Sequence, residues 1–336
     1  MHLELSTWTH HLNQLLYSYF YFCKEEKKEV KFCLNKEVKH NGAILNVNEL
    51  VVFFDYSDDS KFLALPENYN YYFKRSLKVI DKRDNVYPLN FNVPLTYKCH
   101  SLLFKLKKDF ITYKPNKVEI IRAIDSFGLF TNSSHGMLDI RKYPRQIKDF
   151  GGNVIYHTRL WNPDNHLDEE EKERRQIQNE FRINACRIIK KNFKDVSVGL
   201  FSDDLSKKMA PDILLENSNS RKKDYLRKLK GFNIGLADDG LKDNPGWKIG
   251  EYTLYGMAVV TTPLNICLDE FKEGINYQKL SLRSSYEELP NKIENLLKDK
   301  NYLEVGKNNL VWSDYYLHPK NYIKRILSIL ACNKTN

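Results

Sequence analysis

The sequence contains little of what marks a secreted, fibrous or membrane-spanning protein. Only 6 cysteines, 14 glycines and 11 prolines occur among its 336 residues. The cysteines stand singly, without the Cys and His spacings of a zinc site, which is typical of reduced thiols in a cytoplasmic protein. No uncharged apolar stretch approaches the roughly 18 residues that a membrane-spanning helix needs. The start of the chain has Glu4 and three histidines before its first apolar run, so we expect no signal peptide and a cytoplasmic location.

Two common phosphate-binding signatures are also missing. No pair of glycines is spaced as G-x-G, so the dinucleotide-binding fingerprint fails. No Gly-Lys-Ser or Gly-Lys-Thr run exists for a P-loop. These absences argue against a nicotinamide-dependent enzyme and against a P-loop nucleoside triphosphatase.

The chain does carry an excess of positive charge. Its 53 lysines and arginines against 43 aspartates and glutamates give a net charge of +10. Such an excess favours a polyanionic partner, which can be nucleic acid, an anionic membrane surface or a phosphorylated substrate. The densest basic runs, at 221–230 and 105–108, can equally be the solvated faces of ordinary elements. A basic nucleic-acid-binding or anionic-surface-binding protein on a Rossmann-like scaffold is therefore kept as the alternative function.

The pattern of apolar residues predicts an α/β fold with two Rossmann-like domains facing a cleft. In the second half, short apolar runs at 153–160, 196–201, 232–237 and 257–262 alternate with helical segments at 168–192, 222–229 and 247–255. Strands separated by helices in this way form a parallel sheet. The first half is expected to hold a helix at 8–24 and strands at 30–34 and 50–55. We predict an N-terminal domain at 1–148, a C-terminal domain at 149–315 and a last helical segment at 316–336.

The strongest site signal lies between residues 239 and 260. A loop at the carboxyl end of a predicted strand enters a helix at Gly246, so free N–H groups and the positive helix end face the ligand crevice of such sheets. Lys248 in the first helical turn is unusual at an end that prefers anions, and a bound anion would explain it. Glu251 follows three residues later on the same face. A simple capping glycine with a solvated lysine is the alternative, but the combination favours a site.

Residues 246–263, GWKIGEYTLYGMAVVTTP, resemble the donor-site segment of bacterial GT-B glycosyltransferases of the group 1, family 4-like type. In that family a helical Glu and then a Gly precede a Val-Val strand. The resemblance implies an enzyme that moves a hexose-like sugar from a UDP- or GDP-linked donor to a glycan or lipid-linked acceptor. It also implies a role in bacterial surface polysaccharide synthesis and a C-terminal helix that crosses back to the N-terminal domain. Because no Asp-x-Asp pair is present, we expect neither a metal nor another cofactor.

The resemblance also assigns roles on the donor side. Glu251 matches the helical Glu that binds the ribose hydroxyls, and a carboxylate suits two vicinal hydroxyls. Asp243 stands where many retaining members have a catalytic Glu that holds the transferred sugar, so the stereochemistry stays open. Arg159 matches a basic residue near the diphosphate, which suits the planar guanidinium, although a surface Arg at a strand end is the alternative. Gly246, Trp247 and Lys248 complete the predicted donor-binding set.

The acceptor-side candidates come from the first half of the chain. Asp55 ends the strongest apolar strand there and is a candidate general base, although a solvated loop carboxylate is the alternative. Lys74 and Arg75 are candidates to meet a phosphorylated or lipid-linked acceptor, and His135 is a third candidate whose alternative is a structural histidine. Peripheral contact with the anionic inner face of a membrane is compatible with this set, and nucleic acid is not the expected partner.

Overall fold

The computed structural model describes residues 1–93, 95–97, 114–126, 138–139, 142–144, 146–165, 168–216 and 222–332. The chain divides into two compact units. Unit 1 comprises Met1–Tyr143, Asn265–Asp269 and Ser313–Asn336, and unit 2 comprises Pro144–Leu264 and Glu270–Trp312. Each unit contains its own sheet.

Unit 1 is built on a mixed six-stranded sheet with the strand order β2-β1-β3-β4-β5-β6. Strand β3 runs antiparallel to β1 and β4, and the other pairs are parallel. The β3–β4 hairpin turns at Asn48, whose φ of 54° is one that Asn tolerates better than most residues. The strands are β1 (His2–Leu5), β2 (Phe32–Leu34), β3 (Gly42–Val47), β4 (Leu50–Asp55), β5 (Tyr71–Lys74) and β6 (Val86–Pro88), with β7 (Leu95–Thr96) and β8 (Leu138–Asp139) paired separately.

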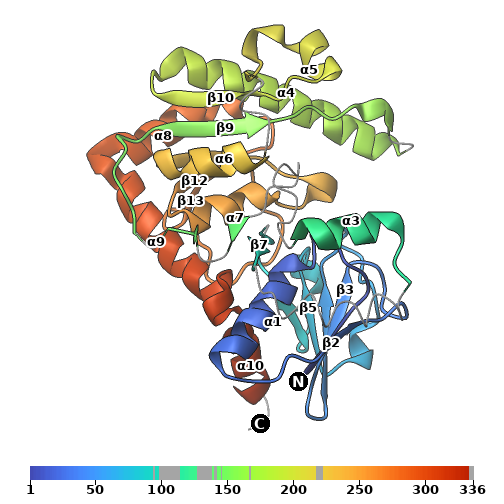
Figure 1. The fold of residues 1–336 in the computed structure, drawn as a ribbon. Helices are drawn as coiled ribbons and strands as arrows, with labels where there is room; N and C mark the ends of the chain where they lie inside the picture. The colour runs from blue at the N-terminus through green and yellow to red at the C-terminus, as the bar shows by residue number, and fades with distance from the viewer. Residues whose placement is uncertain are drawn as a thin grey trace. The chain divides into compact units, whose positions relative to one another are not determined.

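The helices of unit 1 are α1 (Asn13–Glu25), α3 (Lys117–Ser126) and α10 (Pro319–Cys332). Helices α1 and α10 lie side by side although they come from opposite ends of the chain (Figure 1). The apolar stripe of α10 is buried, and the hydroxyl of Tyr322 lies 2.5 Å from that of Tyr56. The Tyr71 hydroxyl also donates to the Leu330 carbonyl at 3.3 Å. The last helix therefore belongs to the core of unit 1.

Unit 2 is a wholly parallel sheet with the strand order β10-β9-β11-β12-β13. The α/β fold with a parallel sheet in the second half is thus confirmed. Its strands are β9 (Val154–Thr158), β10 (Val196–Leu200), β11 (Ile234–Ala237), β12 (Ala258–Thr261) and β13 (Tyr277–Lys279). Its helices are α4 (Glu169–Asn192), α5 (Asp204–Met209), α6 (Lys222–Lys228), α7 (Trp247–Leu254), α8 (Leu289–Leu297) and α9 (Asn301–Tyr316), the last of which continues into unit 1.

Helices cover both faces of this sheet. Alternate strand residues such as Tyr156 and Leu236 form one core with Phe181 of α4 and residues of α8. On the opposite face, Gly235 lies against the ring of Tyr252 in α7, where an added Cβ would come within 2.5 Å of the ring. Because both faces are covered, the strand ends and the loops that follow them are where ligands can meet this sheet.

The described helices include none that is both long and apolar enough to cross a membrane. The predicted elements of 153–262 all occur and differ from the prediction only at their ends. In unit 1 the first helix begins at Asn13 rather than near Trp8, and the sheet gains strands β1, β3, β5 and β6 beyond those predicted.

Candidate functional site

The carboxyl ends of β9 and β11 are tied together by a buried arginine from α4. Arg159 directly follows β9, and Asp238 directly follows β11. Arg182 donates from Nε to Asp238 Oδ2 at 2.6 Å and from Nη1 to the Arg159 carbonyl at 2.6 Å. A guanidinium can make both contacts at once because its donors spread in a plane. Arg182 therefore fixes the relative position of two loops at the edge of the sheet.

Asp238 is a buried carboxylate at the centre of this edge. The Tyr156 hydroxyl donates to its Oδ1 at 2.9 Å, and Lys248 Nζ lies 3.9 Å from the same oxygen. Burial alone would raise the pKa of Asp238, but the charges of Arg182 and Lys248 outweigh burial and hold its pKa below the usual value. Asp238 is thus ionised and holds two cations beside it.

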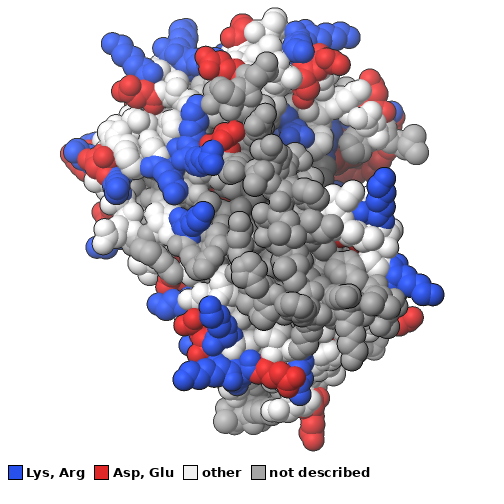
Figure 2. Space-filling view, in the orientation of Figure 1, with Lys and Arg blue, Asp and Glu red and all other residues white. Residues whose placement is uncertain are grey.

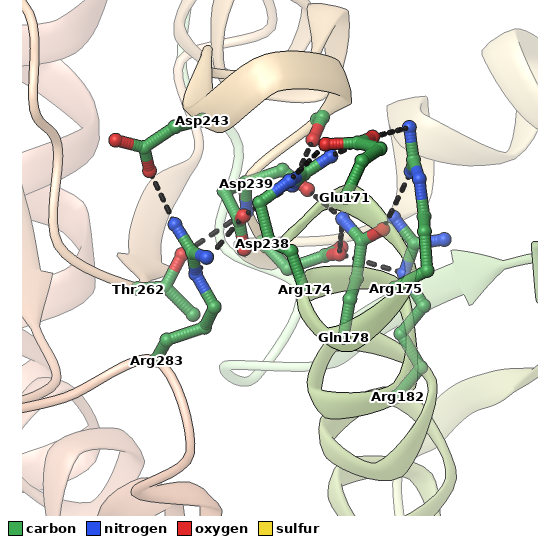
Figure 3. Close-up of polar contacts among 11 residues, drawn as sticks. Glu171, Arg174, Arg175, Gln178, Arg182, Asp238, Asp239, Asp243, Thr262 and Arg283 are labelled. Atoms are coloured by element: carbon green, nitrogen blue, oxygen red, sulfur yellow. Dashed lines mark hydrogen bonds and ion pairs between the residues drawn. The ribbon is translucent and has the colours of Figure 1, made fainter. Parts of the chain in front are cut away.

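Asp239, the next residue, is bound by two further arginines (Figure 3). Arg174 Nη1 lies 3.0 Å and Arg283 Nε lies 3.1 Å from its Oδ2. The Asp239 backbone N–H donates to Thr262 Oγ1 at 3.0 Å, which joins the ends of β11 and β12. Burial, with the neighbouring Asp238 charge, raises the pKa of Asp239. The two acids and their cations form a continuous network, which we call the Asp238–Asp239 cluster: Arg174, Arg182, Asp238, Asp239, Lys248 and Arg283.

Lys248, a predicted donor-binding residue, lies in this cluster. Gly246 is the N-cap residue of α7, and Lys248 occupies the first turn. Its ammonium sits 5.2 Å from the centre of the Tyr156 ring. Burial lowers the pKa of Lys248 to about 8, with Asp238 opposing that shift and Arg182 adding to it. A cation held in a partly dry site of this kind is well suited to an anionic ligand. Trp247, also in the first turn, is half-buried.

Glu251 lies one turn further along α7 and is completely buried. Its Oε1 pairs with Lys222 Nζ from α6. Its Oε2 is buried without a hydrogen-bond partner among the described residues, so one acceptor oxygen of this carboxylate is unused. Glu251 also interacts electrostatically with Lys248. Lys248 and Glu251, the two charged residues predicted on this helix, therefore belong to one group of interacting charges.

Arg159 stands at the exposed rim of the same edge. Its guanidinium lies 5.7 Å from the Trp161 ring centre and 5.4 Å from that of Phe201. In the described part of the chain no carboxylate forms an ion pair with Arg159. Its charge is held in place by aromatic rings rather than neutralised. That arrangement suits a cation that binds an incoming phosphate.

Asp243 is connected to the cluster through Arg283. Arg283 Nη2 pairs with Asp243 while its Nε contacts Asp239. Asp243 and the preceding Lys242 both have positive φ, 60° and 52°, in the loop before α7. Left-handed backbone at two successive non-glycine residues is uncommon and persists where the surroundings hold it. The structure thus brings Asp243, Lys248 and Arg159 to one edge of the unit 2 sheet.

The candidates predicted in unit 1 require a correction. Asp55 and Lys74 are both completely buried, with Lys74 Nζ 2.9 Å from Asp55 Oδ2. Lys74 uses its other donors on the carbonyls of Asp59 and Lys61, each at 2.9 Å. Asp55 also accepts from the Tyr72 hydroxyl at 2.8 Å. We therefore assign Asp55 and Lys74 a structural role, in place of the catalytic and acceptor-binding roles expected from the sequence.

Arg75 is also buried, with an exposed fraction of 4%, and pairs with Asp58. Burial lowers its pKa, and the Asp58 charge opposes that shift. A guanidinium already paired in this way is not presented to an acceptor, so Arg75 too is structural here. His135 lies outside the described residues.

Several site residues escaped prediction from the sequence. Asp238 and Asp239 carry a usable signal, since two acids directly follow a predicted buried strand. Arg182 lies on the helix predicted at 168–192, but nothing local marks it as buried. Arg283 has no local signal at all. Across the described residues, no group of three or more His, Cys, Asp or Glu side chains is placed to hold a metal ion.

Comparison with known proteins finds similarity only at the level of structure. No protein-family model and no curated protein sequence matches the chain. A glycosyltransferase from Rickettsia africae is 8% identical, with 95% of this chain and 80% of that chain covered and a TM-score of 0.43. The C-terminal domain of LpcC, a glycosyl transferase group 1 family protein from Francisella tularensis, is 14% identical over 48% of this chain and 84% of that one, with a TM-score of 0.33. The pneumococcal O-GlcNAc transferase GtfA, solved with UDP and GlcNAc, is 12% identical over 53% of this chain and 36% of that one, with a TM-score of 0.31. The residues of the site therefore carry the functional proposal.

Proposed function

We propose that the protein is a glycosyltransferase that takes a sugar from a nucleotide-sugar donor bound at the carboxyl edge of the unit 2 sheet. One observation carries the proposal. Arg159, Lys248 and Glu251 lie at or beside the Asp238–Asp239 cluster, and they supply two cations and one carboxylate with an unused acceptor oxygen. A nucleoside diphosphate needs cations for its phosphates and acceptors for its ribose hydroxyls. These three residues supply both.

Each residue then has a role in the proposed reaction. Arg159 and Lys248 bind the diphosphate, and Glu251 accepts from the ribose hydroxyls. Asp243 accepts from hydroxyls of the transferred sugar. As the bond between sugar and diphosphate breaks, negative charge grows on the leaving phosphate, and cations already in position stabilise that charge. We propose that these cations do so without a metal ion.

We propose a glycan or lipid-linked acceptor, a role in bacterial surface polysaccharide synthesis, and a cytoplasmic protein that contacts the inner face of the membrane peripherally. The net charge of +10 supports contact with anionic lipid or phosphorylated substrates. Because Asp55, Lys74 and Arg75 are structural, the acceptor-binding residues are left unassigned.

A basic nucleic-acid-binding protein is the alternative that the charge first suggested. Such a protein needs basic residues gathered on one face. Among the described residues visible in Figure 2, lysine and arginine side chains lie interspersed with aspartate and glutamate side chains. Several exposed basic residues are also paired with acids, such as Arg187 with Asp212 at 2.9 Å. These observations favour the enzyme.

Thermal melting with a panel of nucleotides tests the proposal. UDP, GDP, dTDP and CMP are each added to the full chain at millimolar concentration, with and without EDTA. We expect one of the nucleoside diphosphates to raise the melting temperature by a few degrees, since a ligand at 100 times its Kd adds about 2.7 kcal/mol. EDTA should leave that increase unchanged. No stabilisation by any nucleotide, with tight and salt-sensitive binding to DNA, would replace the proposal with the alternative.

A further inference from the structure

Four charged side chains of alternating sign run from helix α4 to the loop before α7 (Figure 3). Arg174 Nη1 contacts Asp239 Oδ2 at 3.0 Å. Arg283 Nε contacts the same oxygen at 3.1 Å, and Arg283 Nη2 pairs with Asp243. Arg283 therefore links Asp243 to Asp239.

The inner end of this series is firmly held. Asp239 is exposed by only 5%, and its backbone N–H is bonded to Thr262. Arg174 also donates to the Gly240 carbonyl at 2.9 Å and makes two hydrogen bonds of 2.7 Å to Glu171. Arg283 is thus bound to a carboxylate, that of Asp239, whose position is fixed. Through its second ion pair, Arg283 restricts the position of the Asp243 carboxylate as well.

Asp243, at the outer end of the series, needs a contact that fixes the position of its side chain. Asp243 is 24% exposed and follows Lys242 in a left-handed backbone conformation that persists only where the surroundings support it. An aspartate also reaches one methylene less far than a glutamate would. Its carboxylate can meet a sugar hydroxyl only if the loop is kept in place. A carboxylate has about four lone-pair sites, so a carboxylate paired with a guanidinium can also accept from hydroxyls.

We propose that Arg283 is a positioning residue for the transferred sugar, acting by holding the Asp243 carboxylate toward the sugar hydroxyls. This inference rests on the proposed function, because it assigns the sugar part of the donor to Asp243. Arg283 has no contact with Lys248 or Glu251 among the interactions of the described residues. Its loss therefore affects the sugar step and leaves nucleotide binding intact.

The chemistry of arginine makes the proposal specific. Arg283 uses two different nitrogens, Nε and Nη2, to reach two carboxylates. Lysine offers a single point charge and cannot reproduce that fork. Arg283→Lys should therefore fail to restore what Arg283→Gln loses, although it keeps the charge.

The test compares nucleotide binding with turnover in matched variants. Calorimetry measures the Kd of UDP and GDP, and hydrolysis of UDP-glucose, UDP-N-acetylglucosamine and GDP-mannose gives kcat/KM. We expect Arg283→Gln to keep the nucleotide Kd within about 2-fold and to lose about 10- to 150-fold in kcat/KM, the range for a hydrogen bond to a charged group. Arg187→Gln, which breaks an exposed ion pair on α4, is the matched control and should change neither value.

A double-mutant cycle separates positioning from a purely structural effect. If Arg283 acts through Asp243, then Arg283→Gln adds no further loss of kcat/KM in an Asp243→Asn background. Equal kcat/KM for wild type and Arg283→Gln, or parallel losses in Kd and kcat/KM, would overturn the inference while leaving the proposed function standing. Failure of the wild type to bind or hydrolyse any of these nucleotides would instead overturn the proposed function, and this inference with it.

Discussion

At the scale of single residues, the site is defined by charges that burial has perturbed. Lys248 is held between Asp238 and the Tyr156 ring, and burial lowers its pKa to about 8. Only the protonated form attracts a diphosphate, and a bound dianion would raise this pKa again. A group with these properties couples ligand binding to pH in the range just above neutrality.

We therefore predict opposite pH responses for binding and for stability. Nucleotide affinity should fall as pH rises from 7.5 to 9, because Lys248 loses its proton near pH 8 while the nucleotide phosphates are already ionised. Without ligand, the free energy of unfolding should rise between pH 8 and 10.5, because the unfolded chain then binds more protons than the folded one. Calorimetric titrations and urea melts of wild type and Lys248→Met test both. The same pH dependence in the variant would contradict this assignment.

The buried pair of Asp55 and Lys74 allows a second prediction at this scale. Replacing Lys74 by Met leaves the Asp55 carboxylate completely buried without its cation, which should cost about 3–5 kcal/mol of unfolding free energy. Breaking the exposed pair of Arg187 and Asp212 by Arg187→Met should cost about 0–1 kcal/mol. Urea denaturation measures both. A Lys74→Met protein as stable as wild type but impaired in transfer would restore an acceptor-binding role for Lys74.

At the scale of secondary-structure elements, the position of α7 on the sheet decides where Glu251 and Lys248 lie. The Tyr252 ring of α7 fills the space above Gly235, and its hydroxyl donates to the Leu236 carbonyl at 3.0 Å. A glycine on β11 is what lets the helix approach so closely. The proposed donor site therefore depends on Gly235, a residue to which no ligand contact is assigned.

Gly235→Ala should consequently harm both stability and binding. The added Cβ would meet the Tyr252 ring at 2.5 Å, and such overpacking costs about 1–3 kcal/mol. Displacement of α7 should also weaken nucleotide binding. Gly231→Ala is the control, because nothing lies within 4 Å of its added Cβ. Thermal melts and nucleotide titrations compare the two variants, and equal behaviour would show that α7 is not positioned by this contact.

Elements of unit 2 could be predicted from the sequence to within a few residues at each end. Their signal is local, since short apolar runs alternate with amphipathic segments that begin at recognisable caps, as at Asp168 before α4. The mixed sheet of unit 1 could not be predicted in the same way. Its strands β5 and β6 are short, and β3 pairs with β1 across a long stretch of sequence. Pairings of that kind are decided by tertiary contacts that no local pattern records.

The same distinction applies to the site. Lys248 and Glu251 could be predicted because a helix start and three-residue spacing are local properties. Arg283 and Lys222 could not, because they reach the site from distant segments. Asp55, Lys74 and Arg75 were assigned the wrong roles because charged residues at a strand end resemble a site in the sequence. In the structure all three are buried, Asp55 and Lys74 are paired with each other, and Arg75 is paired with Asp58.

At the scale of the whole molecule, the last helix completes unit 1 rather than unit 2. Side chains of α10 are buried there, and Arg325 donates to the Pro88 carbonyl at 3.2 Å and pairs with Asp269. The donor-site residues proposed here lie entirely in unit 2. Stability of unit 1 and nucleotide binding by unit 2 should therefore be separable.

Removal of residues 319–336 tests that separation. It takes away the buried side chains of Tyr322, Ile323, Ile326 and Leu330, each worth about 1.5–3 kcal/mol. Their sum approaches the 5–15 kcal/mol that typically stabilises a domain, so unit 1 should unfold. Hydrogen exchange should show lost protection in unit 1 with nucleotide binding retained in unit 2. Deletion of residues 333–336 alone is the control. Full protection of unit 1 in the shorter chain would contradict the role given to α10.

The most direct test of the central claim is calorimetric titration of the nucleoside diphosphate into wild type and Glu251 variants. Glu251→Ala removes the acceptor for both ribose hydroxyls, which should cost about 1.5–3 kcal/mol, or roughly a 10- to 150-fold loss of affinity. Glu251→Gln keeps one acceptor oxygen and should lose less. Thermal melts confirm that each variant is folded. Unchanged affinity in folded Glu251→Ala would remove Glu251 from the site and contradict a donor site at this edge of the sheet.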